Sequence, residues 1–261
     1  MLKSLSTAAT GMAAQQTNLD VISNNLANVS TTGFKKSRAE FEDLMYQNLK
    51  EPGAASGLNA ISPTGVQVGL GVRTAGVQKD FDVGAARPTK QPLDLNIEGP
   101  GFFPIQLSDG QIGYTRDGSF KKDPSGRIVD KNGNPLQPEI VIPANASGIA
   151  ISPNGQVSVL VGNGRDPQNV GQVELVNFVN PAGLKALGKN IYVPSASSGL
   201  PQQAQPGQQG LGHLAQGELE GSNVNIVEEM VNMITAQRAY ETNSKVIQAS
   251  DQMLQYMNQL R

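Results

Sequence analysis

Apolar residues recur every seven positions in the first part of the chain, and no proline interrupts residues 2–32. This spacing places them on one face of an α-helix and is typical of the a and d positions of a coiled coil. We predict that the helix ends where Gly33 can act as a left-handed cap, with Phe34 packed against Val29. The repeat consists of Leu5, Met12, Leu19 and Leu26, followed three places on by Ala8, Gln15, Ile22 and Val29.

Residues 222–261 carry a second heptad pattern and also contain no proline. Asn225, followed three places later by Glu228, resembles a capping box at the start of a helix. A helix of this length spans roughly 55 to 60 Å, which is too long to bury in a small globule. A single heptad pattern is typical of a helix that packs one face on an ordinary core. Two such patterns at opposite ends of the chain favour an antiparallel, coiled-coil-like pair of helices. The repeat consists of Ile226, Met233, Tyr240, Ile247 and Leu254, with Met230, Ala236, Ser250 and Met257 beside it.

Between the two helices, about residues 81–193 alternate short β-prone runs with turn sequences that end at Gly110, Gly118, Gly126, Gly133 and Gly155. Asp-Gly and Asn-Gly pairs supply the positive φ angles of tight turns, so we predict a meander folded into a small barrel or sandwich. The predicted class is α+β, with a pair of terminal helices enclosing a β-rich middle domain. The predicted organisation is an N-terminal helix in 1–35, an extended linker in 36–80, a β-rich domain with a Gly/Pro/Gln-rich return segment in 81–212, and a C-terminal helix in 213–261.

Composition adds a hint of assembly. Charged residues make up 16% of the chain, against about 25% in an average soluble domain, and 44 Asn and Gln outnumber 42 charged residues. Because solubility normally rests on a charged surface, much of this surface is expected to be covered by other subunits. The formal charge of -2, without a run of like charges, argues against nucleic acid as a partner. No apolar stretch approaches the roughly 20 residues that span a bilayer, and no Sec signal is evident.

A search for chemistry finds no convincing catalytic, cofactor or metal site. The absence of cysteine excludes disulfides, thiolate nucleophiles and zinc-cysteine sites. The single histidine, His213, lies in a Gly/Gln-rich linker, where a solvated or packed side chain is the simpler interpretation. Asp109, Asp117, Asp123 and Asp130 lie in or beside turns, where backbone geometry favours Asp. We predict a protein that is not an enzyme and needs no cofactor.

Two classes of function remain open on the residues alone. The first is a structural protein that assembles through its charge-poor helices. The second is a glycan- or peptide-binding β module whose helices serve as an oligomerising stalk. An exposed aromatic platform would favour the second class, and a chain with no tryptophan and five tyrosines supports it weakly.

Three separated motifs resemble the bacterial flagellar rod and hook family. The first is LDVISNNLANVSTTGFK at 19–35, and the last is EGSNVN at 220–225 followed by MITAQRAYE at 233–241. Between them, GFF at 101–103 and YTRDGSF at 114–120 also match. The likeness spans nearly the whole chain. Length, the single modest β domain and the stretch 46–65 are most similar to the distal-rod branch, with the proximal-rod and hook branches as alternatives.

The resemblance implies a structural subunit that polymerises into the distal rod, a shaft that crosses the periplasm and transmits torque to the hook. It implies export through the flagellar type III apparatus without a cleaved Sec signal, a helical homopolymer, and contacts with proximal rod proteins, hook protein and surrounding ring proteins. We also expect termini that fold only on assembly, and a stretch 46–65 that lies between subunits and stiffens the shaft. The expected assembly residues are Leu5, Met12, Leu19, Ile22, Asn25, Leu26, Asn28, Gly33, Phe34, Ile226, Met230, Met233, Tyr240, Ile247 and Leu254.

Overall fold

A computed structural model describes residues 2–51, 55–57, 60–61, 64–162 and 167–259. The chain forms two compact units. The helical unit comprises Met1–Ala27, Ser37–Gln78 and Asn225–Arg261, and the β-rich unit comprises Asn28–Lys36 and Lys79–Val224. The two terminal helices and the strand-rich middle confirm the predicted α+β class. The unit boundaries differ from the predicted organisation. Residues 28–36 join the strands, most of the predicted linker joins the helices, and 213–224, predicted as part of the C-terminal helical segment, belongs to the β-rich unit and contains two strands.

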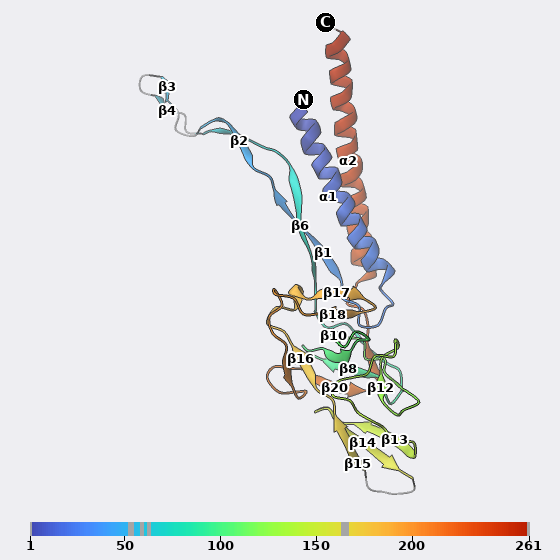
Figure 1. Cartoon of the computed structure of the whole chain (residues 1–261). Coiled ribbons are helices and arrows are strands. Elements are labelled where there is room, and N and C mark those ends of the chain that lie inside the picture. The colour runs from blue at the N-terminus through green and yellow to red at the C-terminus, as the bar shows by residue number, and fades with distance from the viewer. Residues whose placement is uncertain (1, 52–54, 58–59, 62–63, 163–166, 260–261) are drawn as a thin grey trace. The chain divides into compact units, whose positions relative to one another are not determined.

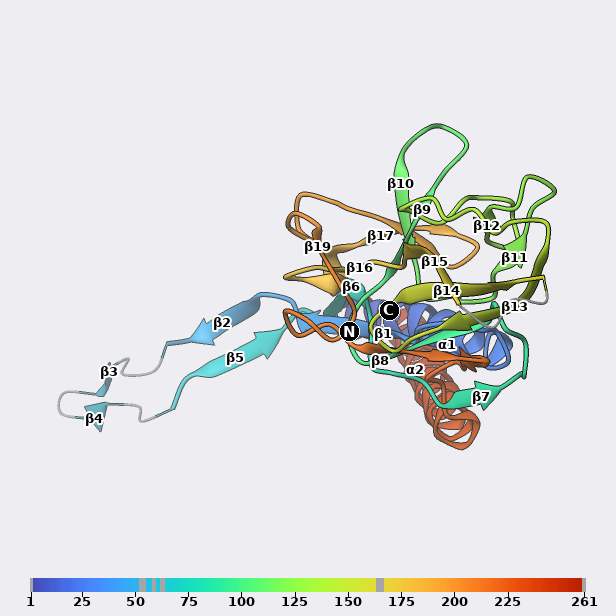
Figure 2. The same ribbon diagram turned by 90° about the horizontal axis from the view of Figure 1, so that it is seen from below.

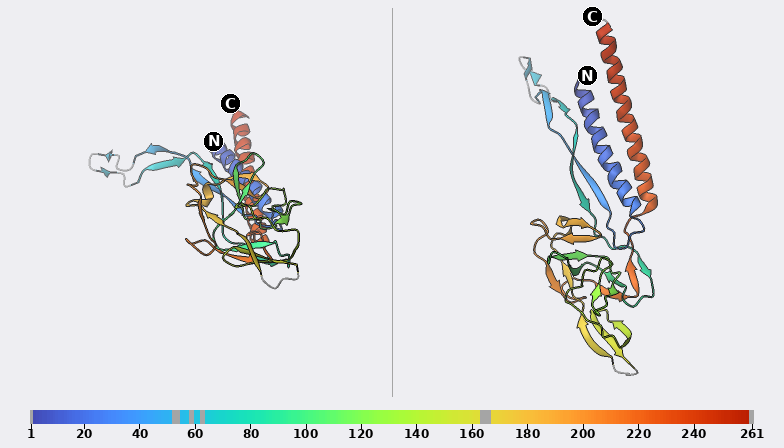
Figure 3. Two further views of the ribbon diagram at one scale, coloured as in Figure 1. Left: turned by 60° about the horizontal axis from the view of Figure 1, so that its bottom comes forward. Right: turned by 45° about the vertical axis from the view of Figure 1, so that its right-hand side comes forward.

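The helical unit is built on two helices, α1 (Leu2–Ala27) and α2 (Ile226–Gln259). They lie side by side and run in opposite directions, so both chain ends lie at the same end of the pair (Figures 1 and 3). The predicted start of α2 is confirmed, because Oδ1 of Asn225 accepts a hydrogen bond from the Val227 N–H at 3.1 Å. Glu228 and Glu229 then place negative charge in the first turn, where the helix dipole favours it.

The predicted end of α1 is wrong. The helix stops at Ala27, and residues 28–33 form turns. Asn28, Thr31 and their neighbours are poor helix formers whose side chains compete for local hydrogen bonds, and Thr31 bonds Asn28 in this way at 3.1 Å. Gly33 does have a φ of 66°, but its N–H donates to the Glu220 carbonyl at 2.8 Å. Gly33 thus serves a close backbone approach within the β-rich unit and is not a helix cap.

A paired β-ribbon completes the helical unit. β1 (Ser37–Asp43) pairs with β6 (Val72–Lys79), β2 (Tyr46–Lys50) pairs antiparallel with β5 (Val66–Gly69), and β3 (Ala55–Gly57) pairs with β4 (Ala60–Ile61). Figure 2 shows the described parts of this ribbon in sequence. The ribbon contacts α1, where the Thr10 hydroxyl accepts a hydrogen bond from the Val72 N–H at 3.4 Å. The segment predicted as an extended linker therefore consists largely of paired strands.

The strands of the β-rich unit form small sheets that, over the described residues, do not close into a barrel. The largest sheet has the order β17-β18-β10-β9, and β13, β14 and β15 form a three-stranded sheet. The remaining pairs are β7 with β21, β8 with β20, β11 with β12, and β16 with β19. The bounds are β7 (Ala86–Pro88), β8 (Leu95–Glu98), β9 (Phe103–Gln106), β10 (Ile112–Thr115), β11 (Lys121–Lys122), β12 (Ile128–Val129), β13 (Ala146–Ile151), β14 (Gln156–Val161), β15 (Gln168–Gln172), β16 (Leu175–Asn177), the 3-10 turn η1 (Pro181–Gly183), β17 (Lys185–Gly188), β18 (Ile191–Val193), β19 (Gln202–Ala204), β20 (His213–Gln216) and β21 (Glu218–Glu220).

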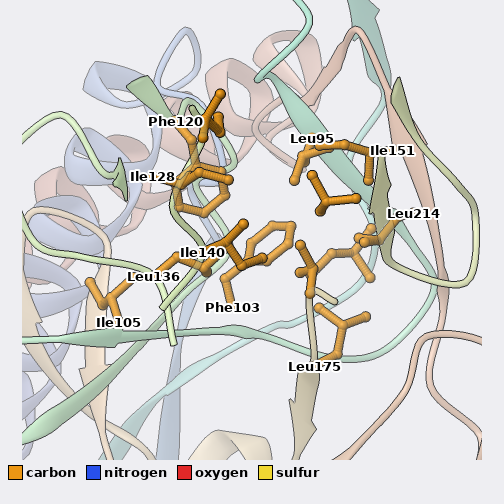
Figure 4. Close-up of a cluster of buried hydrophobic side chains, with 14 of the residues drawn as sticks. Leu95, Phe103, Ile105, Phe120, Ile128, Leu136, Ile140, Ile151, Leu175 and Leu214 are labelled. Carbon is orange, nitrogen blue, oxygen red and sulfur yellow. The ribbon is translucent and has the colours of Figure 1, made fainter. Parts of the chain in front are cut away.

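Two hydrophobic clusters hold these sheets together, and the larger one is built around Phe103. Phe103 packs edge-to-face on Phe120 with ring centroids 5.1 Å apart, among buried branched side chains from most of the strands (Figure 4). Four of the predicted turn glycines, at 110, 126, 133 and 155, have positive φ as expected. Gly118 does not, and there the absence of a side chain makes room for the Leu95 carbonyl.

Candidate functional site

The seam between α1 and α2 is made mostly of small and polar side chains. Asn25 Nδ2 donates to Glu229 Oε2 at 3.2 Å, and a Cβ at Gly11 would lie 3.0 Å from Nδ2 of Asn243. These two contacts are fourteen residues apart on each helix, which is two heptads, so they define one antiparallel register. The buried residues that the structure describes along the pair are Ala8, Ala14, Ile22 and Asn25 in α1, and Glu229, Ala236 and Ser250 in α2.

The predicted assembly residues fall into several environments. Within the helices, Ile22 and Asn25 are buried, while Ile226, Met230 and Tyr240 are exposed. Half-buried positions flank the seam, namely Leu5, Met12, Leu19, Leu26, Met233, Ile247 and Leu254. The structure separates the other three from this group, because Asn28, Gly33 and Phe34 belong to the β-rich unit. Phe34 is buried there, with the Lys79 ammonium 5.4 Å from its ring centroid, rather than in the predicted helix cap.

The first turns of α2 carry an exposed apolar surface, which we call the outer stripe: Ile226, Val227, Met230, Val231 and Ile234. Val227 is 70% exposed and Val231 is 57% exposed. Their spacing of three and four residues places them along one side of the helix, and contiguous apolar surface of this kind marks interaction sites. Sequence reasoning found Ile226 and Met230 but missed the others, although a second three/four spacing beside the heptads would have revealed them.

The ribbon is a second exposed apolar surface. Eight of its described residues project large apolar side chains into solvent, and Met45 is 80% exposed. A two-stranded ribbon is marginally stable on its own, so packing against further protein would stabilise it. The eight residues are Phe41, Met45, Tyr46, Leu49, Val66, Val68, Leu70 and Val77.

Sequence reasoning missed a buried ion cluster in the β-rich unit. Lys35 Nζ lies 2.7 Å from Glu220 Oε1, and Arg116 Nη1 lies 3.4 Å from Glu220 Oε2. None of the three side chains is more than 2% exposed. Burial lowers the pKa of Lys35 and of Arg116, and the Glu220 carboxylate opposes both shifts. Backbone carbonyls complete the shell, since Lys35 donates to Asp82 O at 2.6 Å and Arg116 donates to Gly99 O at 2.7 Å.

Asn223 binds together the chain segments beside this cluster. Its Oδ1 accepts from the Lys36 N–H at 2.7 Å, and its Nδ2 donates to the Asp80 carbonyl at 3.0 Å. The Asp80 N–H in turn donates to the Lys36 carbonyl at 2.9 Å. Residues near 36, 80 and 223 lie at three of the four places where the chain passes from one compact unit to the other, the fourth being between residues 27 and 28. The β-rich unit therefore fixes these three crossing points relative to one another by hydrogen bonds and ion pairs.

An aromatic group packs beside the ion cluster. Phe81, Phe102 and Tyr192 meet edge-to-face with ring centroids 5.3 to 6.1 Å apart. Burial, with a smaller contribution from the Glu220 carboxylate, raises the pKa of Tyr192 to about 12.

We expect the stability of the protein to fall as the pH rises from 10 to 12. In the unfolded chain Tyr192 loses its proton near the ordinary tyrosine pKa of 10.0, whereas in the folded protein it keeps the proton up to a pKa of about 12, so in this window the folded state binds more protons. Spectrophotometric titration of tyrosinate, undisturbed by tryptophan, checks the shift. Tyr192→Phe should remove one proton from the late titration, to which Tyr46 and Tyr114 with their raised pKa values also contribute, and should flatten the loss of stability. An unchanged titration would contradict the assignment.

The acidic residues considered as candidate catalytic groups stabilise turns. Asp109, Asp117, Asp123 and Asp130 each accept a hydrogen bond from the backbone N–H two residues further on, which confirms their interpretation as turn residues. Among the described residues, no cluster of His, Cys, Asp and Glu is placed to hold a metal. No described helix combines the length and hydropathy needed to cross a membrane.

Comparison with known proteins identifies three matched segments. Residues 5–35 match the family described as flagella basal body rod protein, residues 96–159 match the flagellar hook protein FlgE/F/G D1 domain, and residues 215–260 match the flagellar basal body rod FlgEFG protein C-terminal region. Lys35, Arg116 and Glu220 lie one in each segment, so the buried ion cluster is where the three meet.

Curated relatives match the whole chain. The flagellar basal-body rod protein FlgG of Buchnera aphidicola subsp. Schizaphis graminum is 51% identical over 260 residues. The protein of the same name is 49% identical in Caulobacter vibrioides and 40% identical in Bacillus subtilis. In all three comparisons the alignment covers 100% of this chain and 100% of the relative.

Proposed function

Because the chain belongs to the flagellar basal-body rod protein family, we propose that it is the structural subunit that polymerises into the distal rod of the flagellar basal body. In this role it transmits motor torque to the hook. Full-length identity of about half to relatives named flagellar basal-body rod protein supports the assignment.

The outer stripe of α2 is the observation in the structure that favours polymerisation. A lone subunit would leave five neighbouring apolar side chains in water, and contacts with other copies would cover them. Burying each is worth roughly 1.5 to 3 kcal/mol. The half-buried residues of both heptad repeats, Leu19 and Ile247 among them, would extend the same contacts.

The seam between the helices supports the further proposal that the termini fold fully only on assembly. Most of its buried residues are Ala, Ser, Asn or Glu, so little apolar area is buried to offset the ordering entropy of two long helices. Neighbouring subunits would supply the missing burial.

We propose that the ribbon stiffens the shaft by lying between subunits. Its exposed apolar residues, including Met45, Tyr46 and Leu49, support this role. The part of the stretch 46–65 that falls at 52–54, 58–59 and 62–63 lies outside the described residues.

The proposed partners follow from the place of the distal rod. They are proximal rod proteins on one side, hook protein on the other, the surrounding ring proteins, and the type III apparatus that exports the subunit across the inner membrane. A proximal-rod or hook position in the same organelle is the alternative. A glycan-binding β module is less well supported, because the aromatic rings of Phe81, Phe102 and Tyr192 pack on one another instead of forming an open platform.

Localisation in purified basal bodies tests the assignment. A flagellated strain that lacks its own related rod protein is complemented with this chain carrying an epitope tag at the exposed turn around Gly110. We expect restored swimming and antibody label on the outer part of the rod in electron micrographs. Label confined to the inner rod or the hook would favour one of the alternative positions, and unlabelled basal bodies would reject a rod role.

A further inference from the structure

Asn25 is a buried amide whose hydrogen bonds join three elements of the helical unit. The residue is 1% exposed, and a buried amide is costly unless it is hydrogen-bonded. Its Oδ1 accepts from the Ser37 N–H at 2.8 Å, and its Nδ2 donates both to the Ser37 carbonyl at 2.8 Å and to Glu229 Oε2 at 3.2 Å. Both amide hydrogens are thereby used.

The two bonds to Ser37 match those that a neighbouring β-strand makes with a residue it faces. Ser37 is the first residue of β1, so the side chain of Asn25 fixes where the ribbon begins relative to the last turn of α1. The hydrogen bond from Asn25 to Glu229 fixes the position of α2 relative to α1, because Glu229 lies in the first turn of α2.

The apolar heptads alone do not select an alignment. Met233, Tyr240, Ile247 and Leu254 repeat every seven residues, so a slip of one heptad presents a similar face. Such a slip brings Ala236 or Ser222 opposite Asn25 in place of Glu229. A buried polar group at a single heptad position is a known means of fixing register in coiled coils.

We infer that Asn25, Glu229 and Ser37 form a register lock that holds α1, α2 and β1 in one alignment. Its functional consequence rests on the proposed polymerisation. A helical polymer repeats the same contacts at every subunit. The position of the outer stripe relative to the ribbon must therefore be the same in every copy. Asn25 and Glu229 are positioning residues in this scheme, because they set where the contacting surfaces lie.

Engineered cysteines measure the register directly, because the chain has no cysteine of its own. The pair Gly11→Cys/Asn243→Cys reports the observed register, since a Cβ at Gly11 lies 3.5 Å from Cγ of Asn243. The pair Gly11→Cys/Ser250→Cys reports a slip of one heptad. Equilibration of the purified full chain with glutathione, in an excluded osmolyte that favours the folded termini without polymer, gives the effective concentration of each thiol pair.

Replacing the lock by the apolar pair Asn25→Leu/Glu229→Leu should lower the effective concentration of the native pair about tenfold or more and raise that of the slipped pair. Helix content by circular dichroism should be retained, because apolar area is added to the seam. Asn18→Leu, one heptad before Asn25 and half-buried, is the matched control and should keep the native register. Glu229→Gln retains an acceptor and should also keep it.

An unchanged native pair in Asn25→Leu/Glu229→Leu would overturn the lock. Rod assembly and swimming are scored separately in the same variants. A native register in the wild type together with failure to enter rods would reject the proposed function and leave the lock intact. Register loss with normal rods would reject the functional consequence of the lock.

Discussion

Glu220→Gln should destabilise the β-rich unit by about 3 kcal/mol or more. The substitution preserves the size of the side chain but leaves the Lys35 ammonium and the Arg116 guanidinium buried without a counter-ion, and breaking a buried ion pair in this way costs roughly 3 to 5 kcal/mol. Equilibrium unfolding of the full chain in urea, followed by tyrosine fluorescence, measures the loss.

Glu218→Gln supplies the control for this prediction. It lies on the same strand, β21, is half-exposed and should change stability by no more than about 0.5 kcal/mol. A third variant, Lys35→Met/Arg116→Met/Glu220→Leu, removes all three charges and should recover part of the stability lost in Glu220→Gln, because an apolar cluster needs no counter-ion. A loss below about 1 kcal/mol in Glu220→Gln would show that water or movement of the chain relieves the uncompensated charge.

The effect of Glu220→Gln on swimming should be larger than its effect on stability alone. The cluster lies beside three of the four points at which the chain passes between its compact units, and Asn223 joins those three points by hydrogen bonds. Loosening them would weaken a subunit that has to carry torque. Swimming speed in a viscous medium, where the load on the shaft is high, provides the readout.

Local periodicity made the helices and turns predictable. A seven-residue repeat and an N-terminal cap such as Asn225 depend on neighbouring residues, so the capping pattern located the start of α2. The predicted C-terminal helical segment nevertheless began too early, at 213, because the strands at 213–220 are paired with distant segments. The turn glycines at 110, 126, 133 and 155 are equally local, because the φ angle depends on the residue itself.

The end of α1 shows where local reasoning fails. Gly33 followed by an apolar residue has the sequence of a helix stop, but its conformation is set by the Glu220 carbonyl and by the backbone of Arg116. Those groups are distant in sequence, so no pattern near Gly33 could reveal them. The buried ion cluster was missed for the same reason, since a charged residue in a sequence motif does not say whether its partner is water or another chain segment.

The heptad pattern identified only part of the helix seam. It included Ala8 and Ile22, which the structure buries, but it also included Leu5, Met12 and Leu19, which the structure leaves half-buried. A heptad identifies the apolar side of a helix but does not say whether that side faces the same chain or another. In a subunit that polymerises, we interpret the large apolar residues as those that pack against neighbouring subunits, and the small ones as those that pack against the partner helix.

The double substitution Met230→Asp/Ile234→Asp should abolish rod assembly and swimming while leaving the folded subunit as stable as the wild type. Both residues belong to the outer stripe and are about half exposed, at 51% and 49%, so the charges cost little in the isolated chain. In the polymer they would remove roughly 3 to 6 kcal/mol of apolar burial per subunit, which weakens association by more than about 100-fold. Sedimentation of subunits in vitro and electron microscopy of basal bodies measure the loss.

Two matched variants separate burial from charge. Met230→Leu keeps the apolar area and should assemble normally. Asn232→Asp adds a carboxylate to an exposed position on the other side of the same helix, about 160° around the axis from Met230, and should impair assembly less than the double substitution. If Met230→Asp/Ile234→Asp still forms full-length rods, the outer stripe does not lie between subunits, and the contacts that hold the shaft together must be sought on the ribbon and on the half-buried Leu5, Met12 and Leu19 side of α1.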